Sequence, residues 1–250
     1  MSSLSVSLIV FACLFGGALL GIFLRTVVPE RHLDADSKSS VNLMMGVIST
    51  MSALVLGLLV ASAASSYFAQ KDEVTQVSAK FILLDRLLAH YGPEARPTRE
   101  MLRLKVAAVI DQMWPQERAS NSTVAPNTGA EVLFDEIQQL APQNDVQRSI
   151  KSEALSLALD VGKTRWLMFE QGSLPIPIVF LVVVVFWFTI VFASHGLHAP
   201  RNPTVIIALF LCALSVAGAV LMILELYKPF EGLIQISSAP MRSALAQLGK

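Results

Sequence analysis

Charged side chains are scarce in this chain of 250 residues, of which they make up 15%, and the mean hydropathy is +0.58. Soluble globular proteins carry about 25% charged residues. The deficit is local, because four stretches hold no Lys, Arg, Asp or Glu: 1–24, 39–70, 171–200 and 202–224. The composition therefore excludes a soluble enzyme and indicates an integral membrane protein.

The chain also lacks an excess of charge of either sign, since it has 19 basic and 19 acidic residues. Without a basic stripe that neutralises phosphates, nucleic acid is not an expected partner. Only two cysteines occur, Cys13 and Cys212, and each lies inside an apolar run. We interpret both as packing residues rather than as a disulfide, so cysteine usage leaves the redox compartment open.

Signatures of catalysis are missing as well. No glycine-rich phosphate loop precedes a helix, and neither G-x-S-x-G nor H-E-x-x-H occurs. His195 and His198 stand three residues apart, which is a possible metal-ligand spacing, but no Cys, Asp or Glu accompanies them. We favour a solvated loop after the third apolar run for this pair. The sequence therefore predicts no enzyme, no catalytic residues, no cofactor and no metal.

Four apolar runs are long enough for the roughly 20 residues of a spanning helix: 4–24, 41–69, 174–194 and 204–226. The first lacks the basic n-region and the cleavage site of a signal peptide, so we expect it to be retained. Four spans place both termini and the central block on one side of the membrane. Basic residues near the span ends are more frequent on that side than in the two opposite loops, 25–40 and 195–203, which favours the cytoplasm.

The central block 71–170 holds 12 of the 19 basic and 14 of the 19 acidic residues. Its first apolar positions continue from the second span at alternating steps of three and four and stop before Gly92-Pro93, which predicts one helix that leaves the membrane. These positions are Val74, Val77, Phe81, Leu84, Leu88 and Tyr91. Further helices are predicted from a Thr98 cap to Trp114, over 129–141, and over 143–171 with Val146 and Ala154 on its apolar face.

No alternating strand pattern occurs, so the predicted fold class is all-α, with four transmembrane helices and a helical cytosolic domain inserted between the second and the third. The predicted parts are the first two membrane helices (1–70), the helical domain (71–171), the last two membrane helices (172–228) and an amphipathic tail (229–250). The tail is either a clasp on the helical domain or an element that closes the cytoplasmic mouth.

The second span carries small residues at three- and four-residue steps, a face that lets helix backbones approach closely in a bilayer. We assign helix packing to Gly46, Ala53, Gly57 and Ala61. The same helix has five serine hydroxyls, which either line a water-filled path or pack as small residues. These pore-lining candidates are Ser49, Ser52, Ser62, Ser65 and Ser66.

The other spans differ from the second. In the first span, Gly17 and Gly21 form a close-approach pair, and the fourth carries the small stripe Ala208, Cys212, Ser215 and Ala219, whereas the bulky third span is expected to face lipid. Glu225 is the one carboxylate inside the last span, and ionisable residues at such positions are often functional. It either pairs with Lys228 or belongs to a polar site shared with another helix.

Several blocks carry a family resemblance: 53–61 (ALVLGLLVA), Ser66-Tyr67, Leu84-Asp85-Arg86, 91–95 (YGPEA) and a tail block from Leu224 to Pro240. Together they resemble the bestrophin-like domain family of bacterial membrane proteins, a domain of unknown function, although Tyr227 stands where that family often has an Asp. The resemblance implies distant kinship with bestrophins, pentameric anion channels with four membrane helices per subunit. In bestrophins the second helix lines the pore and continues into a helical cytosolic domain.

The resulting expectation is an oligomeric ion channel of the bacterial inner membrane, with the second span along a central path. Its partners are then the lipid bilayer, small ions and further copies of the chain, five in all if it resembles bestrophins. The alternative is a non-conducting scaffold or signalling subunit that binds a partner through its helical domain. A transporter is less favoured, because no pair of Gly/Pro-interrupted spans occupies corresponding halves of the chain.

Overall fold

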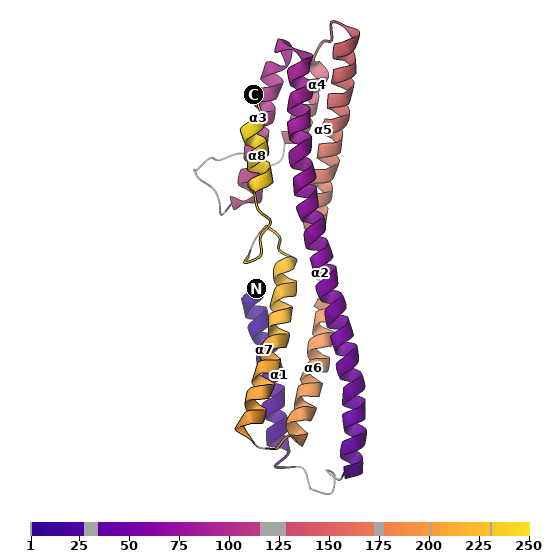
Figure 1. Cartoon of the computed structure of the whole chain (residues 1–250), viewed down its shortest axis with the longest axis vertical. Coiled ribbons are helices and arrows are strands. Elements are labelled where there is room, and N and C mark those ends of the chain that lie inside the picture. Colours follow the sequence, from indigo (N-terminus) through magenta and orange to yellow (C-terminus); the bar gives the residue numbers. More distant parts are fainter. Residues whose placement is uncertain (1, 28–34, 116–128, 173–177, 201, 231) are drawn as a thin grey trace. The chain divides into compact units, whose positions relative to one another are not determined.

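Figure 1 shows the computed structural model of the chain, which describes residues 2–27, 35–115, 129–172, 178–200, 202–230 and 232–250. Within these ranges every regular element is a helix, as the all-α prediction requires. The chain divides into two compact units. Unit 1 comprises Met1–Ser66 and Pro175–Tyr227, and unit 2 comprises Tyr67–Leu174 and Lys228–Lys250.

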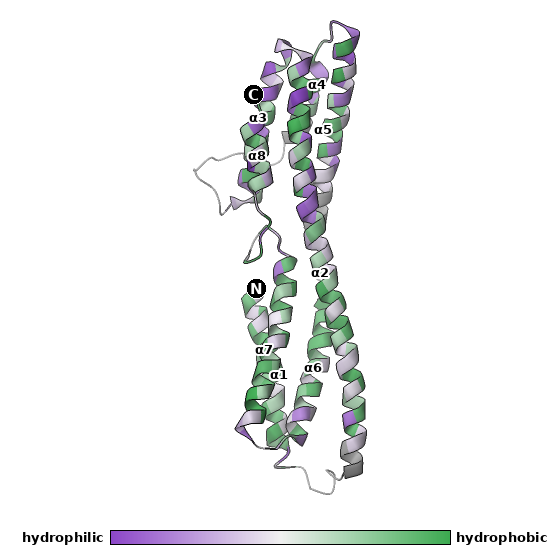
Figure 2. Ribbon diagram, in the orientation of Figure 1, coloured by the Kyte–Doolittle hydropathy of each residue, from purple (hydrophilic) through white to green (hydrophobic). Residues whose placement is uncertain are grey.

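Unit 1 is built from α1 (Ser3–Leu24), the first part of α2 (Ala35–Tyr91), α6 (Ile178–His198) and α7 (Pro203–Leu226). Each of these helices is long and apolar enough to cross a membrane, which agrees with the four predicted spans. Figure 2 shows the hydrophobic colour over α1, α6, α7 and the first part of α2. Residues 28–34 of the predicted loop 25–40, and Arg201 of the predicted loop 195–203, lie outside the described residues.

α1 and α6 approach each other closely through glycines. A Cβ placed on Gly21 would overlap the carbonyl oxygen of Ala193, and one placed on Gly196 would overlap a carbonyl oxygen of α1. One turn earlier, a Cβ on Gly17 would lie only 3.0 Å from the side chain of Thr189. Glycine permits such backbone contact in a bilayer because no side chain separates the helices. The predicted close approach at Gly17 and Gly21 is confirmed, and α6 is the partner.

The expectation that the third span faces lipid is therefore wrong for one of its faces. Leu181 and Phe192 of α6 are buried in a core shared with α1 and α7, whereas Phe180 and Phe186 are exposed. The histidine pair is also not in a loop, because α6 continues through His198. Pro200 follows shortly after the helix end, where its ring and missing N–H do not favour helix continuation.

α7 packs in unit 1 through a face other than its predicted small-residue stripe. Ala213, Ala217 and Val220 are buried, and the Ser7 hydroxyl of α1 donates a hydrogen bond of 2.7 Å to the carbonyl of Ala217. Three members of the predicted stripe, among them Cys212, are instead exposed. Within its own chain the stripe thus contributes little to the contacts of α7.

α2 is one uninterrupted helix of 57 residues. At a rise of 1.5 Å per residue it is about 85 Å long, nearly three times the thickness of a bilayer core. It ends at Tyr91 because Gly92 adopts a φ of 130°, a conformation that L-residues rarely take. The predicted continuation of the second span into a polar helix that stops before Gly92 is confirmed.

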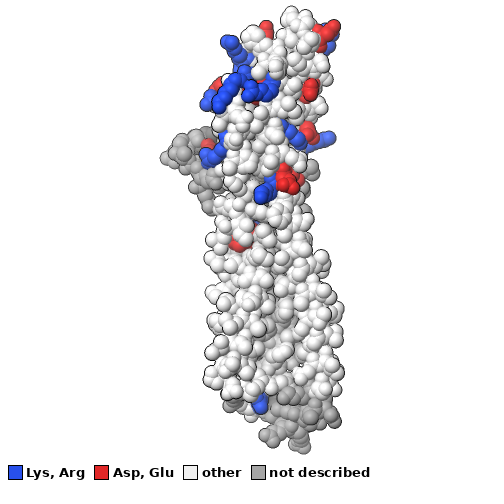
Figure 3. All heavy atoms as spheres, viewed as in Figure 1, with Lys and Arg blue, Asp and Glu red and all other residues white. Residues whose placement is uncertain are grey.

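Unit 2 contains the second part of α2, the short 3-10 helix η2 (Pro93–Ala95) and four further helices. These are α3 (Arg96–Met113), α4 (Gly129–Gln139), α5 (Asp145–Gly172) and α8 (Ala239–Gln247). All six apolar positions predicted on the continuation of α2 are buried in its core: Val74, Val77, Phe81, Leu84, Leu88 and Tyr91. The heptad seam is therefore used inside the unit. In Figure 3, most charged side chains on the visible face gather over unit 2.

Two details of unit 2 differ from the prediction. Thr98 does not cap α3, because the helix begins at Arg96 with a proline in its first turn, and Thr98 is buried within it. Proline is favourable there because the first helical N–H groups have no partner within the helix. On α5, Ala154 is buried as predicted, together with Val161, but Val146 is 68% exposed. The packed face thus begins further along α5 than the apolar pattern suggests.

The tail after α7 packs on the core of unit 2. The indole N–H of Trp114 donates a hydrogen bond of 2.7 Å to the carbonyl of Ile236, and Phe230 meets the Trp114 ring edge to face. Met241 and Leu248 are buried in the same core. The tail thus has the contacts expected of a clasp on the helices of its own unit.

Candidate functional site

The serines predicted to line a path lie at different depths along α2. Ser52 is buried, and its hydroxyl donates a hydrogen bond of 2.7 Å to the carbonyl of Ile48. Ser49 is half-buried and donates in the same way to the carbonyl of Met45, also at 2.7 Å. A hydroxyl bonded to the preceding helical turn is satisfied without an outside partner. These two serines are therefore compatible with an apolar surrounding.

Ser62 and Ser65 are exposed, and Ser66 is half-buried. Successive residues of an α-helix are rotated by about 100°, so Ser62 and Ser65 lie within roughly 60° of each other around the axis. Ser49 lies roughly 140° away from Ser62 on the same count. A straight pore that runs parallel to α2 can therefore be lined by only some of the five candidate serines. The exposed pair Ser62 and Ser65 is the part left open to water or to another chain.

The small-residue face of α2 is uncovered in the single chain. Gly46, Ala53, Gly57 and Ala61 are all exposed. A Cβ placed on Gly46 or Gly57 would have no neighbouring atom within 4 Å. This face contrasts with Gly21 of α1, which is in backbone contact with α6. The sequence pattern is similar in both helices, but only α1 uses it inside the chain.

A different face of α2 holds the helix against unit 1. Leu59 and Ala63 are buried together with Val184 of α6 and Ile223 of α7. Much of the remaining apolar surface of α2 is exposed, including Leu43, Met44, Val47, Met51, Leu54 and Leu58. Of the four candidate spans, α2 has the smallest share of its apolar stretch covered by its own chain.

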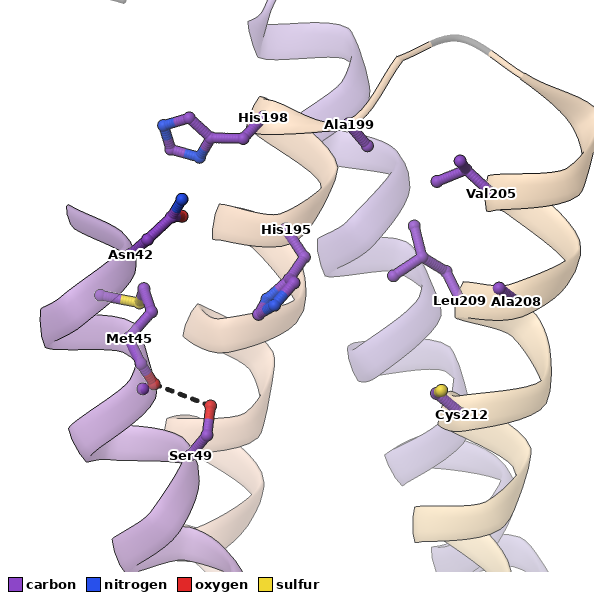
Figure 4. A pocket seen from close by; sticks show the side chains of 11 residues that line it. Asn42, Met45, Ser49, His195, His198, Ala199, Val205, Ala208, Leu209 and Cys212 are labelled. Carbon is purple, nitrogen blue, oxygen red and sulfur yellow. Dashed lines mark hydrogen bonds between the residues drawn. The ribbon is translucent and has the colours of Figure 1, made fainter. Parts of the chain in front are cut away.

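A pocket of about 530 Å³ opens between the first turns of α2, the end of α6 and the start of α7. Figure 4 shows His195 and His198 projecting from α6 into this space, with Asn42 of α2 beside His198. Ser49 of α2 and Cys212 of α7 also line the pocket. The sequence singled out the histidine pair but gave no signal for Asn42, because nothing local places the start of α2 beside α6.

Both histidines are anchored by the helix that carries them. Nδ1 of His195 lies 2.8 Å from the carbonyl oxygen of Val191, and Nδ1 of His198 lies 2.8 Å from that of Ser194. Because a carbonyl oxygen only accepts, each Nδ1 is the protonated nitrogen in these bonds. In a neutral ring the lone pair then resides on Nε2. The pocket is thus lined by two imidazoles of fixed tautomer.

Glu225 is 5% exposed and lies on α7 next to Ile223 and Leu224, which are buried in the cores of unit 1. A carboxylate at this depth is costly unless it is paired or hydrogen-bonded. Both alternatives for Glu225, pairing with Lys228 and a polar site shared with another helix, stay predictions.

Metal-ligating side chains do not form a larger cluster: no group of three or more His, Cys, Asp and Glu in the described part of the chain is placed to hold an ion. Cys13 and Cys212 are both free cysteines, but both are exposed in the single chain, so the prediction that they are packing residues is wrong within it. Among the described residues, the two pocket histidines therefore have no third His, Cys, Asp or Glu placed to bind the same ion.

Unit 2 contains a buried ion pair that joins α2 to α3. Asp85 is 1% exposed, and Arg99 donates two hydrogen bonds of 2.9 Å to its two carboxylate oxygens. The hydrogen bonding to Asp85 raises the pKa of the Arg99 guanidinium, against the opposing effect of burial. The backbone N–H of Gly249 donates to Asp85 at 3.2 Å, and Arg99 also donates to the carbonyl of Lys250 at 3.0 Å. Asp85 was part of the family-like block Leu84-Asp85-Arg86, but its partner could not be read from the sequence.

Comparison with known proteins gives a consistent result. A family profile described as "Bestrophin-like domain" matches residues 12–241. A tryptophan-to-alanine variant of a bacterial bestrophin homologue from Klebsiella pneumoniae superposes with a TM-score of 0.68 at 16% identity, covering 99% of this chain and 97% of that one. Another structure of the Klebsiella pneumoniae homologue gives a TM-score of 0.64 at 12% identity, covering 92% of this chain and 95% of that one. A search of curated proteins gives no match. At these identities the structural likeness concerns the fold.

Proposed function

This chain belongs to the Bestrophin-like domain family, and on that basis we propose that it is a homo-oligomeric ion channel of the bacterial inner membrane, with the membrane-spanning part of α2 along the pore. Unit 2 and both termini then lie in the cytoplasm, as the distribution of basic residues favours. The observation that carries the proposal is the uncovered small-residue face of α2.

Further copies of the chain would complete this surface. Gly46 and Gly57 have open space where a side chain would begin, so another helix could approach α2 as closely as α6 approaches α1. Five copies are the expected number if assembly resembles that of bestrophins. If the α2 helices of all copies pack against one another, they form a closed ring around the symmetry axis. The pore then runs along this axis, and α2 lines it.

The exposed hydroxyls of Ser62 and Ser65 support conduction along that axis. Ions that lose part of their hydration shell need donors and acceptors in the pore wall, and serine hydroxyls provide both. Ser52 is buried in its own chain and contributes to the shape of the helix contact rather than to the path. Of the five serine candidates, Ser62 and Ser65 are therefore the first to test.

Cysteine accessibility in planar bilayers tests the proposal. In a Cys13→Ala/Cys212→Ala background, Ser62→Cys and Ser65→Cys channels should lose most of their current when a charged thiol reagent is added. Ser215→Cys is the matched control, because Ser215 is also an exposed membrane serine but lies on α7. Equal block of all three, or a purified oligomer that conducts no ion under varied voltage and pH, contradicts the proposal. A sealed oligomer that retains a stoichiometric partner would instead favour the scaffold alternative.

A further inference from the structure

The side of α2 that carries Ser65 continues beyond the apolar stretch to an acidic residue. α2 is helical throughout Ala35–Tyr91, so the angular positions of its residues follow from a rotation of about 100° per residue. Asp72 comes seven residues after Ser65, which places it about 20° from Ser65 around the helix axis and about 10 Å further along it. It is the first carboxylate after the charge-free run 39–70. Each chain thus presents one acid two turns beyond Ser65, on the same side of the helix.

Asp72 points away from the core of its own unit. On the same stretch of α2, Gln70 and Val74 are buried, whereas Asp72 and Gln76 are exposed. Among the described residues, no Lys or Arg forms an ion pair with Asp72. Its negative charge is therefore not offset by a partner in the described part of the chain.

The basic residues of this part of α2 are turned away, paired or distant. Lys71 is rotated by about 120° from Ser65. Lys80 lies about 60° from Ser65, but its ammonium is 2.6 Å from a carboxylate oxygen of α5. Arg86 is about 21 Å beyond Asp72, which is about two Debye lengths at 0.1 M salt. The uncompensated charge on the Ser65 side is thus negative where α2 leaves the apolar stretch.

We propose that Asp72 sets the ion selectivity of the channel and that the conducted ions are cations. The inference rests on the proposed function, because α2 has to line the pore for its exposed side to meet the ions. In a closed ring of copies, every chain contributes one Asp72 at the same depth, so the carboxylates form a ring of like charge. Acidic rings select cations in channels, and low-dielectric walls around a narrow passage focus their field. The resemblance to bestrophins implies anions instead, so the two expectations differ in sign.

Reversal potentials of the purified full chain in planar bilayers test this sign. Under a KCl gradient, the unmodified chain should favour K⁺ over Cl⁻, and Asp72→Asn should lower the K⁺/Cl⁻ permeability ratio several-fold. The Debye length shrinks from about 10 Å at 0.1 M salt to about 3 Å at 1 M, so the difference should be large in dilute KCl and small in concentrated KCl. Asp135→Asn is the matched control and should leave the ratio unchanged, because Asp135 is an exposed acid of α4.

Restoring the charge chemically separates selectivity from a structural effect. In the Cys13→Ala/Cys212→Ala background, Asp72→Cys channels should lose the preference for K⁺. An anionic thiol reagent should restore this preference, and a cationic reagent should shift the permeability ratio towards Cl⁻. A change caused by altered packing would not follow the sign of the attached charge.

Two kinds of failure can be told apart. A Cl⁻ preference of the unmodified chain, or an unchanged permeability ratio in Asp72→Asn, overturns the role of Asp72. The proposed function stands in that case if Ser62→Cys channels are still blocked by the charged thiol reagent. An oligomer that carries no current refutes the proposed function, and the selectivity inference with it.

Discussion

Gly21 of α1 lies in direct backbone contact with Ala193 of α6, so close that no side-chain carbon fits between the two helices. Gly196 repeats this contact one turn further along α6, against α1. The arrangement makes glycine a requirement at both positions, since alanine would have to push the helix backbones apart.

Replacing Gly21 or Gly196 by Ala should therefore destabilise unit 1. Overpacking of a well-packed contact costs about 1–3 kcal/mol, and here the obstacle is backbone rather than a movable side chain. The measurement is the thermal unfolding midpoint of the detergent-solubilised protein, followed by circular dichroism. Gly16→Ala is the control, because a Cβ at Gly16 meets no atom within 4 Å. Equal losses for Gly16→Ala and Gly21→Ala would contradict the packing account.

The ion pair between Asp85 and Arg99 leads to a second prediction. Asp85→Asn leaves the Arg99 charge without its carboxylate, and breaking a buried pair in this way costs about 3–5 kcal/mol. The double variant Asp85→Asn/Arg99→Gln should recover part of the loss, because it removes the uncompensated charge. Thermal unfolding measures both effects.

The surface pair between Glu100 and Arg103 provides the control for this prediction. Its nitrogen–oxygen distance is 3.8 Å, and both side chains are exposed to solvent. Glu100→Gln should change stability by no more than about 1 kcal/mol, since exposed pairs contribute little. A similar loss in Glu100→Gln and Asp85→Asn would show that burial does not set the cost.

Tyr91 is expected to tolerate the loss of its hydroxyl. Its side chain is buried, and among the described residues the oxygen has no hydrogen-bond partner. Tyr91→Phe should therefore be neutral or stabilising, because an unsatisfied polar group is removed. Tyr67→Phe is the matched control and should lose about 0.5–1.5 kcal/mol, because the Tyr67 hydroxyl donates to the carbonyl of Gln235 at 3.3 Å. The comparison fails if Tyr91→Phe is the more damaging change.

The same residue predicts a pH dependence in the alkaline range. Burial, and to a smaller extent the charge of Glu94, raise the pKa of Tyr91 above its ordinary value of 10.0. A raised pKa in the folded state favours the neutral phenol, so its contribution to stability is present below pH 10 and is lost as the pH rises through the folded-state pKa. Ultraviolet titration should show a late phenolate that is absent from Tyr91→Phe.

The indole of Trp114 should govern how firmly the tail is attached. Trp114→Phe keeps an aromatic ring beside Phe230 but removes the donor to the carbonyl of Ile236, at a cost of about 1–3 kcal/mol for the unpaired carbonyl. We expect faster tryptic cleavage after Arg242 in the tail. Trp166→Phe is the control, because Trp166 is 68% exposed. Unchanged cleavage in Trp114→Phe would contradict this anchoring role.

Much of the fold follows from local pattern. Hydropathy located all four membrane helices, and Gly92 marked the end of α2, because these signals reside in consecutive residues. Contacts between distant segments were harder to predict. The spacing of Gly17 and Gly21 predicted that another helix approaches α1 closely. The partner Gly196 was missed, because the third apolar run was taken to end at Ser194, whereas α6 continues to His198.

In the candidate site, too, local pattern predicted some features, whereas others depend on contacts between distant segments. The small residues and serines of α2 were evident from their spacing, yet their exposure in the single chain depends on which face Leu59 and Ala63 occupy. Asn42 joins His195 and His198 only through the arrangement of three helices. Such a pocket is a property of tertiary packing, and no periodicity in one segment encodes it.

The contact between α1 and α6 also has a consequence for biosynthesis. Next to it, Arg25 donates to the carbonyl of Ala199, 174 positions later in the chain. At the 5–20 residues per second of ribosomal synthesis, α1 emerges roughly 10–35 s before the partner that its glycines fit. α1 must therefore remain in the membrane without α6 against its glycine face during this interval. The tightest contact in unit 1 is among the last to form during translation.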